Sequence, residues 1–438
     1  MSLRRQLLVS FGVQGAGAAS VLLATFWLGA SLGAEVQGSF SRSKSELEFV
    51  VAFAMFGLPQ ALFFYVKSGG LAARAALRWA LGSALLAAPI GGLYALWQHG
   101  AAGALPWVLG AAVAACVAQG QLRALLLVAP RPTWFNAVTA APQVLALIGV
   151  ALVIGSMAVP HAVTWFALLG VASGLAALLA SWRLGLRFGA AKEASVVIGS
   201  RASNVATVWN ASIAPSAPSA TSAATVSSAS NALNVGWRAL AHYGLAAWLT
   251  AALSTAAILA MQRWVETAEG RAALGRFTIA MTLVQVPLTP IAYAAPLLLR
   301  RWMEWPGAAA SRRWGARVFA ALLVFAAIVG ALATRWPDLG LGPSYAGATA
   351  ALALLLVGGA AEAASRVLTV QASATGLPWV AVRAECLRWA VLALGWLAPL
   401  PGGLLPLCAV WAAAAIASAA VFVWHGRVGA SVNAGAAA

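Results

Sequence analysis

The feature that most constrains this chain is a series of charge-free apolar runs, each about as long as a membrane-spanning helix. Residues 6–34, 49–66, 239–262 and 277–299 contain no Asp, Glu, Lys or Arg. A helix needs about 20 apolar residues to cross the roughly 30 Å of hydrocarbon in a bilayer. Only 8% of the 438 residues are charged, whereas a soluble domain carries about 25% charged residues. We therefore expect an all-α integral membrane protein.

Longer apolar stretches divide into paired spans at Gly and Pro residues, which are typical of turns. Such interruptions lie near residue 99, at 155–160 and at 399–403. The predicted membrane-spanning helices, about twelve in all, cover residues 7–32, 47–66, 75–97, 105–128, 134–155, 162–186, 239–262, 273–298, 314–334, 346–370, 379–398 and 404–424.

Lys and Arg are distributed unequally between the two sides of this arrangement. If the N-terminus is cytoplasmic, most of the 27 basic residues face the cytoplasm, and the outer side receives only Arg42, Lys44, Arg263, Arg271, Arg276 and Arg335. Cytoplasmic loops of membrane proteins carry an excess of Lys and Arg. Both termini are therefore predicted to be cytoplasmic. This insertion signal, which faces anionic lipid, accounts for most of the net charge of +17, so we expect no nucleic-acid partner.

The chain is predicted to consist of two six-helix bundles, residues 1–188 and 236–438, joined by a cytoplasmic segment. That segment, residues 189–235, is rich in Ala, Ser, Thr, Val and Asn, which is typical of a flexible linker. The two halves also share a short echo, because a Gly-x-Phe motif follows the first helix of each, at 38–40 and at 275–277. Six helices per half predict pseudo-symmetric repeats related by an axis along the membrane normal.

Four short motifs carry a resemblance to a known family. They are LGAEVQGSF at 32–40, FGLPQAL at 56–62, YG at 243–244 and LGPSYAGA at 341–348. In these elements and their order the chain resembles the O-antigen-type polysaccharide flippases of the multidrug/oligosaccharidyl-lipid/polysaccharide (MOP) exporter superfamily.

The resemblance implies an alternating-access transporter that moves an undecaprenyl-pyrophosphate-linked oligosaccharide from the inner to the outer leaflet. It also implies the bacterial cytoplasmic (inner) membrane, with membrane lipids, a polysaccharide polymerase and chain-length machinery as partners. The chain departs from related sequences at Gln262-Arg263, where they often carry an acidic residue, and in the length of its 189–235 segment. The first departure puts a shared ion-coupling site in doubt.

Basic residues inside or beside the spans are the candidates for binding a lipid pyrophosphate. Arg and Lys make strong charge-assisted contacts with phosphate, and Arg can bind it through two parallel hydrogen bonds. A basic residue at mid-membrane costs about 2.5–3.5 kcal/mol on insertion scales, so deep positions are informative. The candidate substrate-binding residues are Arg78, Arg123, Arg366, Arg383 and Arg388 within the spans, with Arg42 and Arg276 at the outer mouth. Snorkelling explains Arg78 and Arg123 equally well.

Glu362 and Glu385 are candidates for gating or ion coupling, because carboxylates inside transporter membranes often mark ion pathways. Glu362 can pair with Arg366 at i, i+4, and Glu385 with Arg388 at i, i+3. A charge cluster that only fixes two helices together is the alternative interpretation. His242, at the inner start of the seventh helix, is a further candidate for proton relay.

Two other functions stay open at this stage. A multidrug or cation antiporter of the same superfamily would favour acidic cavities, whereas this chain has 10 acidic and 27 basic residues. A membrane-embedded polysaccharide polymerase would show a large outer loop with catalytic Asp, Glu or His. No catalytic triad, metal-ligand spacing or phosphate-binding loop occurs in the sequence, so we expect no enzyme activity, no metal and no cofactor.

Overall fold

A computed structural model describes residues 3–67, 71–100, 103–128, 133–156, 160–190, 237–304, 308–374, 377 and 379–435. The described residues are almost entirely helical, which confirms the all-α prediction. The helices are α1 (Leu3–Ala54), α2 (Leu58–Lys67), α3 (Ala73–His99), α4 (Leu105–Leu127), α5 (Thr133–Gly155), α6 (Ala162–Ala190), α9 (Trp237–Glu304), α10 (Ala308–Leu332), α11 (Ala348–Ala374), α12 (Trp379–Leu397) and α13 (Leu404–Gly435), with a short 3-10 helix η2 (Pro343–Tyr345).

The two longest helices are each broken by one glycine. Gly33 in α1 has φ 82° and ψ 174°, and Gly270 in α9 has φ 82° and ψ 175°. Only glycine adopts such positive-φ backbone without steric cost. Each glycine therefore reverses the chain between two membrane-length helices.

Divided at these two glycines, the helices agree with the twelve predicted spans. Nine helices among the described residues are long and apolar enough to cross a membrane, and two of the nine contain Gly33 and Gly270. The α12 helix adds a span that carries three charges, at Arg383, Glu385 and Arg388. The α2 helix completes the second span beyond a kink at Phe56 (φ 47°) and Gly57 (φ 67°).

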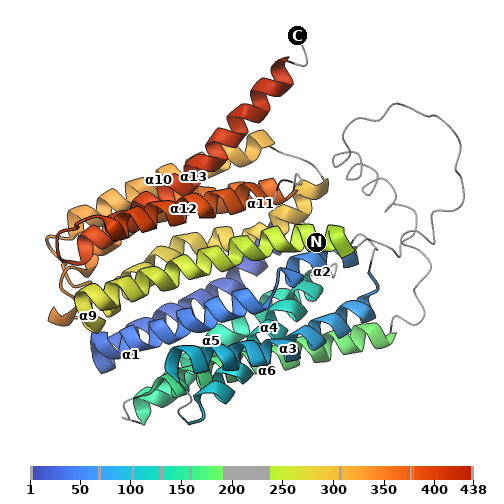
Figure 1. The fold of residues 1–438 in the computed structure, drawn as a ribbon, viewed down its shortest axis with the longest axis horizontal. Helices are drawn as coiled ribbons and strands as arrows, with labels where there is room; N and C mark the ends of the chain where they lie inside the picture. Colours follow the sequence, from blue (N-terminus) through green and yellow to red (C-terminus); the bar gives the residue numbers. More distant parts are fainter. Residues whose placement is uncertain are drawn as a thin grey trace, which may run out of the picture.

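The helices form two stacked halves with α1 and α9 side by side between them (Figure 1). The half at the bottom of the view contains α2–α6, and the half at the top contains α10–α13. Each half has its own apolar core, one around Val113 and Leu122 and the other around Leu274 and Leu355. The predicted boundaries at 188 and 236 stay predictions, since the described chain stops at Ala190 and resumes at Trp237.

The two ends of the molecule differ in which segments they hold. One end, on the left in Figure 1, holds the chain reversals at Gly33 and Gly270, and we call it the turn end. The helix α1 begins and α13 ends toward the opposite side, which we call the termini end. This common side for both termini is what an even number of spans requires.

At the turn end the helices extend beyond the predicted spans, which end at 32 and 262 and resume at 47 and 273. Residues 34–46 belong to the second helix of α1, and residues 263–269 continue the first helix of α9. The charged residues in these segments pair with one another, which stabilises them within the helices.

Candidate functional site

The two halves cross at a pair of glycines at the turn end. Gly38 lies five residues after Gly33, and Gly275 lies five residues after Gly270. A Cβ placed on Gly38 would lie 2.7 Å from the carbonyl oxygen of Arg271. A Cβ on Gly275 would lie 2.8 Å from the carbonyl carbon of Ala34. The repeated Gly-x-Phe motif therefore places one glycine from each half in backbone contact with the opposite half.

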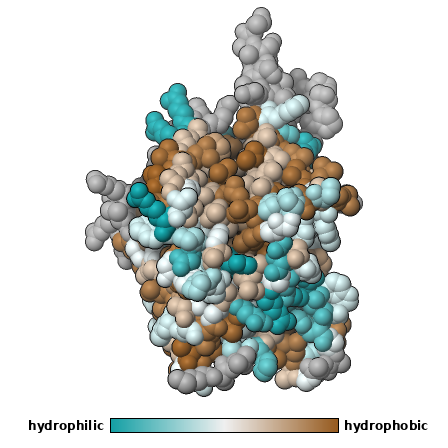
Figure 2. Space-filling model, turned by 90° about the vertical axis from the view of Figure 1, so that its left-hand side faces the viewer, coloured by the Kyte–Doolittle hydropathy of each residue, from teal (hydrophilic) through white to brown (hydrophobic). Residues whose placement is uncertain are grey.

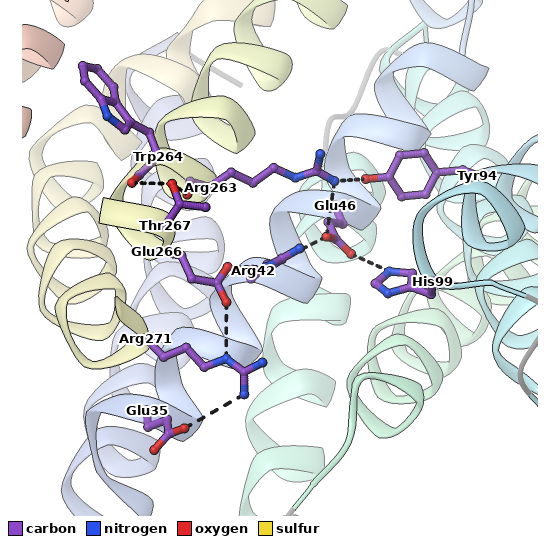
Figure 3. Close-up of polar contacts among 10 residues, drawn as sticks. All are labelled: Glu35, Arg42, Glu46, Tyr94, His99, Arg263, Trp264, Glu266, Thr267 and Arg271. Atoms are coloured by element: carbon purple, nitrogen blue, oxygen red, sulfur yellow. Dashed lines mark hydrogen bonds and ion pairs between the residues drawn. The ribbon is translucent and has the colours of Figure 1, made fainter. Parts of the chain in front are cut away.

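An ionic network joins the halves beside this crossing (Figure 3). We call it the cross-half network, and it comprises Glu35, Arg42 and Glu46 of α1 with Arg263, Glu266 and Arg271 of α9. Arg42 pairs with Glu266 across the halves, and its Nε lies 3.1 Å from Glu46 Oε1 in its own helix. Arg271 Nε lies 3.3 Å from Glu266 Oε1. Hydrophilic side chains also gather on the face of the molecule at this end (Figure 2).

Glu46 is the most buried member of the network, with its side chain 2% exposed. Its carboxylate lies 3.0 Å from His99 Nε2 of α3 and 3.7 Å from Arg263 Nη2 of α9. The same Arg263 nitrogen donates to the Tyr94 hydroxyl at 3.1 Å. A buried carboxylate is strongly unfavourable unless it is paired, and Glu46 obtains partners from both halves.

If the halves separate, the two least exposed carboxylates of the network keep a cation of their own half, whereas Arg263 loses its contacts with Glu46 and Tyr94. After separation, Glu46 would keep Arg42 and His99 from its own half. Glu266 would keep Arg271 from its own half. Because Glu46 and Glu266 each retain a cation, opening strands neither carboxylate, which for a buried ion would cost about 3–5 kcal/mol. This property is what a reversible gate requires.

A tyrosine from the second half is inserted into the first half at the same end. Tyr345 in η2 is fully buried, and its hydroxyl donates to Gln37 Oε1 at 2.8 Å. A Cβ on Gly29 would lie 3.2 Å from Tyr345 Cζ, so the glycine provides the space for the ring. Tyr345 also packs with Ala34 and Ile279 in an apolar cluster that contains residues of both halves.

The halves also touch nearer the termini end, through backbone and aromatic contacts. Gly57 lies against Gly244, since a Cβ on Gly57 would lie 2.8 Å from the Gly244 carbonyl carbon. Trp248 donates its indole N–H to the Phe53 carbonyl at 2.8 Å, and the Phe56 ring stacks on its indole at 5.7 Å. The motifs FGLPQAL and YG thus meet at this contact.

A second group of charges lies within the second half, on α11 and α12. Arg366 Nη2 lies 2.6 Å from Glu362 Oε1 and donates to Gln285 of α9 at 3.3 Å. Arg388 Nη1 lies 3.5 Å from Glu385 Oε2. The predicted i, i+4 and i, i+3 pairs are therefore both present. Arg388 is only 3% exposed.

The other predicted residues lie apart from these two groups. Arg78 is exposed on α3, and Arg383 is exposed on α12 with Nη1 3.1 Å from His425 Nε2. Arg123 is half-buried on α4, with Cζ 5.7 Å from the centre of the Phe135 ring. Arg276 is half-buried and donates to the Ala346 carbonyl at 3.3 Å. The side chain of His242 lies outside the described residues.

Sequence reasoning did not identify the cross-half pairing. The i, i+4 spacing of Arg42 and Glu46 is a local signal of a helix, and it could have extended the predicted span 47–66 toward its N-terminus. The pairing of Arg42 with Glu266 joins residues far apart in the chain and has no local signal. The same holds for Tyr345 and Gln37.

Comparisons with known proteins agree with this architecture. A solved structure described as "MATE in the straight conformation" has a TM-score of 0.61 at 16% identity, covering 98% of this chain and 95% of that chain. An inward-facing multidrug resistance MATE family transporter of the MOP superfamily has a TM-score of 0.63 at 14% identity, covering 97% and 98%. An outward-facing one has a TM-score of 0.61 at 15% identity, covering 98% and 95%.

Neither a protein-family profile nor a curated protein sequence matches the chain significantly. The structural likeness extends over nearly the whole chain and includes both halves. It agrees with the superfamily that the motifs suggested, at the level of the fold. This chain has the fold of the MATE transporters.

Proposed function

We propose that this protein is an alternating-access transporter that exports an undecaprenyl-pyrophosphate-linked oligosaccharide from the inner to the outer leaflet. The observation that carries the proposal is the junction at the turn end. Two halves with separate cores meet there through ion pairs and a buried tyrosine, and Glu46 and Glu266 each keep a cation of their own half if the ion pairs separate. Structures of this fold exist in inward- and outward-facing conformations, as the two solved transporters are described.

The buried charges favour an anionic substrate over a cationic one. Among the described residues, the buried carboxylates are Glu46, Glu362 and Glu385, and each has an arginine partner. A cationic substrate would have to compete with these guanidinium groups. A pyrophosphate, in contrast, can bind arginine through charge-assisted hydrogen bonds.

The predicted cations divide into two groups in this proposal. Arg42, Arg366 and Arg388 already contact carboxylates, so they would bind phosphate only if those pairs separated. We propose direct phosphate contact for the other predicted cations, Arg78, Arg123, Arg276 and Arg383. We propose gating or ion coupling for Glu362 and Glu385, whose pairs lie inside the second half.

Deletion followed by a leaflet-resolved assay of lipid-linked oligosaccharide tests the proposal. We expect the complete lipid-linked oligosaccharide to accumulate on the cytoplasmic side. An unchanged distribution between the leaflets would overturn the proposal. Shortened or unpolymerised glycan, with normal leaflet distribution, would point instead to a polymerase.

A multidrug antiporter is the second candidate, and the described activity of the solved transporters favours it. A comparison of the deletion strain with the parent strain distinguishes the two functions. Deletion should leave the susceptibility of cells to cationic dyes unchanged while altering glycan export. Increased dye accumulation with normal glycan export would establish the antiporter instead.

A further inference from the structure

The first half contains a long segment whose basic residues have no acidic counterpart in sequence. Residues 49–192 include no Asp or Glu. The basic residues of the segment are Lys67, Arg74, Arg78, Arg123, Arg131, Arg183, Arg187 and Lys192. In the second half, by contrast, Arg366 and Arg388 each pair with a carboxylate of the same helix. The counter-ions for the termini end of the first half are therefore expected to come from outside this segment.

Arg183 is held in place by aromatic rings. It lies near the end of α6, and its Cζ is 5.1 Å from the centre of the Trp134 ring of α5. The Trp134 ring meets the Trp182 ring edge-on at 6.2 Å. Arg183 Nε is buried and has no hydrogen-bond partner among the described atoms. A cation–π contact contributes about 0.5–2 kcal/mol and leaves the charge without a counter-ion.

We propose that Arg183, Trp134 and Trp182 form a binding site for the phosphate headgroup of an anionic phospholipid from the leaflet at the termini end. The guanidinium group matches phosphate oxygens in a two-pronged geometry. Tryptophans favour the level of the headgroups at a membrane interface. Basic pockets between membrane helices are known to bind anionic headgroups. Trp182 is 57% exposed, so the site opens toward the surroundings of the protein.

The position of the site favours a bilayer lipid over the exported one. The helix α6 packs chiefly on α4 and α5, whereas the halves meet along α1 and α9 (Figure 1). A lipid at α5 and α6 would therefore remain bound while the halves move. The inference is independent of the proposed export function.

Native mass spectrometry of the purified full chain measures this binding, with phosphatidylglycerol and phosphatidylcholine as probes. Wild type should retain phosphatidylglycerol in preference to phosphatidylcholine. Arg183→Gln should weaken phosphatidylglycerol binding about fivefold, the expected effect of one basic residue at an anionic surface. Arg317→Gln, which removes an exposed cation from α10, is the matched control and should bind like wild type.

Trp182→Ala is a second test variant, because an exposed side chain can be removed without disturbing the core. It should also weaken the preference for phosphatidylglycerol. Equal binding by wild type, Arg183→Gln and Trp182→Ala would overturn the proposal. So would one-for-one displacement of phosphatidylglycerol by a short-chain polyprenyl diphosphate, since that result would assign the site to the exported class of lipid.

Discussion

Glu46, Glu362 and Glu385 are the buried carboxylates of the described chain, and an arginine lies beside each of them. Their surroundings nevertheless differ. Glu362 and Glu385 are paired within one half, whereas Glu46 is shared by Arg42 of its own helix and Arg263 of the other half. At the residue scale, this difference separates carboxylates paired within a single helix from a carboxylate shared between the two halves.

Replacing Glu46 with Gln should weaken the turn end. The substitution leaves Arg42, Arg263 and His99 without their shared acceptor charge. Loss of a buried hydrogen-bonded partner costs about 1–3 kcal/mol, so the melting temperature of the purified protein should fall. Glu48→Gln is the matched control, because Glu48 is 50% exposed and pairs only with Lys44 among the described residues. Its effect should stay below about 1 kcal/mol, and equal melting temperatures for both variants would contradict this role.

Arg388 and Arg383 should respond differently to the same substitution, although the sequence predicted one role for both. Arg388→Gln strands the buried Glu385 carboxylate, which costs about 3–5 kcal/mol of stability. Arg383→Gln removes an exposed group and should change stability by less than about 0.5 kcal/mol. Equilibrium unfolding in detergent measures both values. If Arg383→Gln were as destabilising as Arg388→Gln, the assignment of Arg388 to helix packing would be wrong.

The sequence predicted these candidate residues but could not rank them. Local spacing indicated the pairs of Arg366 with Glu362 and Arg388 with Glu385, because i, i+3 and i, i+4 neighbours lie on one face of a helix. Exposure of Arg383 depends on which face of α12 packs against other helices. The packing of all the helices of the half decides which face of α12 is buried, so no short motif predicts the exposure of Arg383.

The two broken helices α1 and α9 decide the geometry at the element scale. Gly33 and Gly270 reverse the chain with nearly identical backbone angles, and Gly38 and Gly275 follow them at the crossing. The same local sequence pattern thus produces the same turn and the same close approach in both halves. This likeness supports the pseudo-symmetry that the Gly-x-Phe echo suggested.

A methyl group at the crossing should force the two helices apart. Gly275→Ala places a Cβ against the backbone carbonyl of Ala34, and overpacking of this kind costs about 1–3 kcal/mol. Gly330→Ala in α10 is the control, because its Cβ would lie 3.6 Å from Ala353 Cβ, an ordinary contact. Helix propensity should make that control neutral or more stable by up to about 1 kcal/mol. Melting temperatures that rank the two variants in the opposite order would exclude the close crossing.

Helix number was predictable from the sequence, whereas the ends of the helices at the turn end were not. The charge-free runs predicted the positions of the membrane-spanning helices, because an unpaired charge in the hydrocarbon is energetically unfavourable. The predicted spans stop short of residues 34–46 and 263–269, which carry charges, yet both segments are helical, and their charges pair within α1 and α9 as well as between them. The ion pairs that join the two halves are tertiary contacts, so no local sequence pattern predicts them.

At the scale of the whole molecule, the structure has two halves with separate cores. The halves are joined by one kind of contact at the turn end and by another kind nearer the termini end. The contacts at the turn end include ion pairs, one tyrosine and the close backbone approach at Gly38 and Gly275, whereas those at Gly57 and Trp248 are backbone and aromatic. Ion pairs can exchange partners for water and for residues of their own half. We therefore expect the turn end to open during transport.

Cross-linking across the junction tests this account most directly. In a variant whose native cysteines Cys116, Cys386 and Cys408 are replaced, cysteines at Arg42 and Glu266 would be joined by a short, cleavable bifunctional reagent. Cysteines at Lys44 and Glu48, both in α1, provide the control link within one half.

The measured quantity is the amount of lipid-linked oligosaccharide that reaches the outer leaflet. We expect the link between residues 42 and 266 to stop export and cleavage of the reagent to restore it, whereas the link between residues 44 and 48 should have no effect. Export at the wild-type rate with the halves cross-linked at 42 and 266 would contradict this expectation.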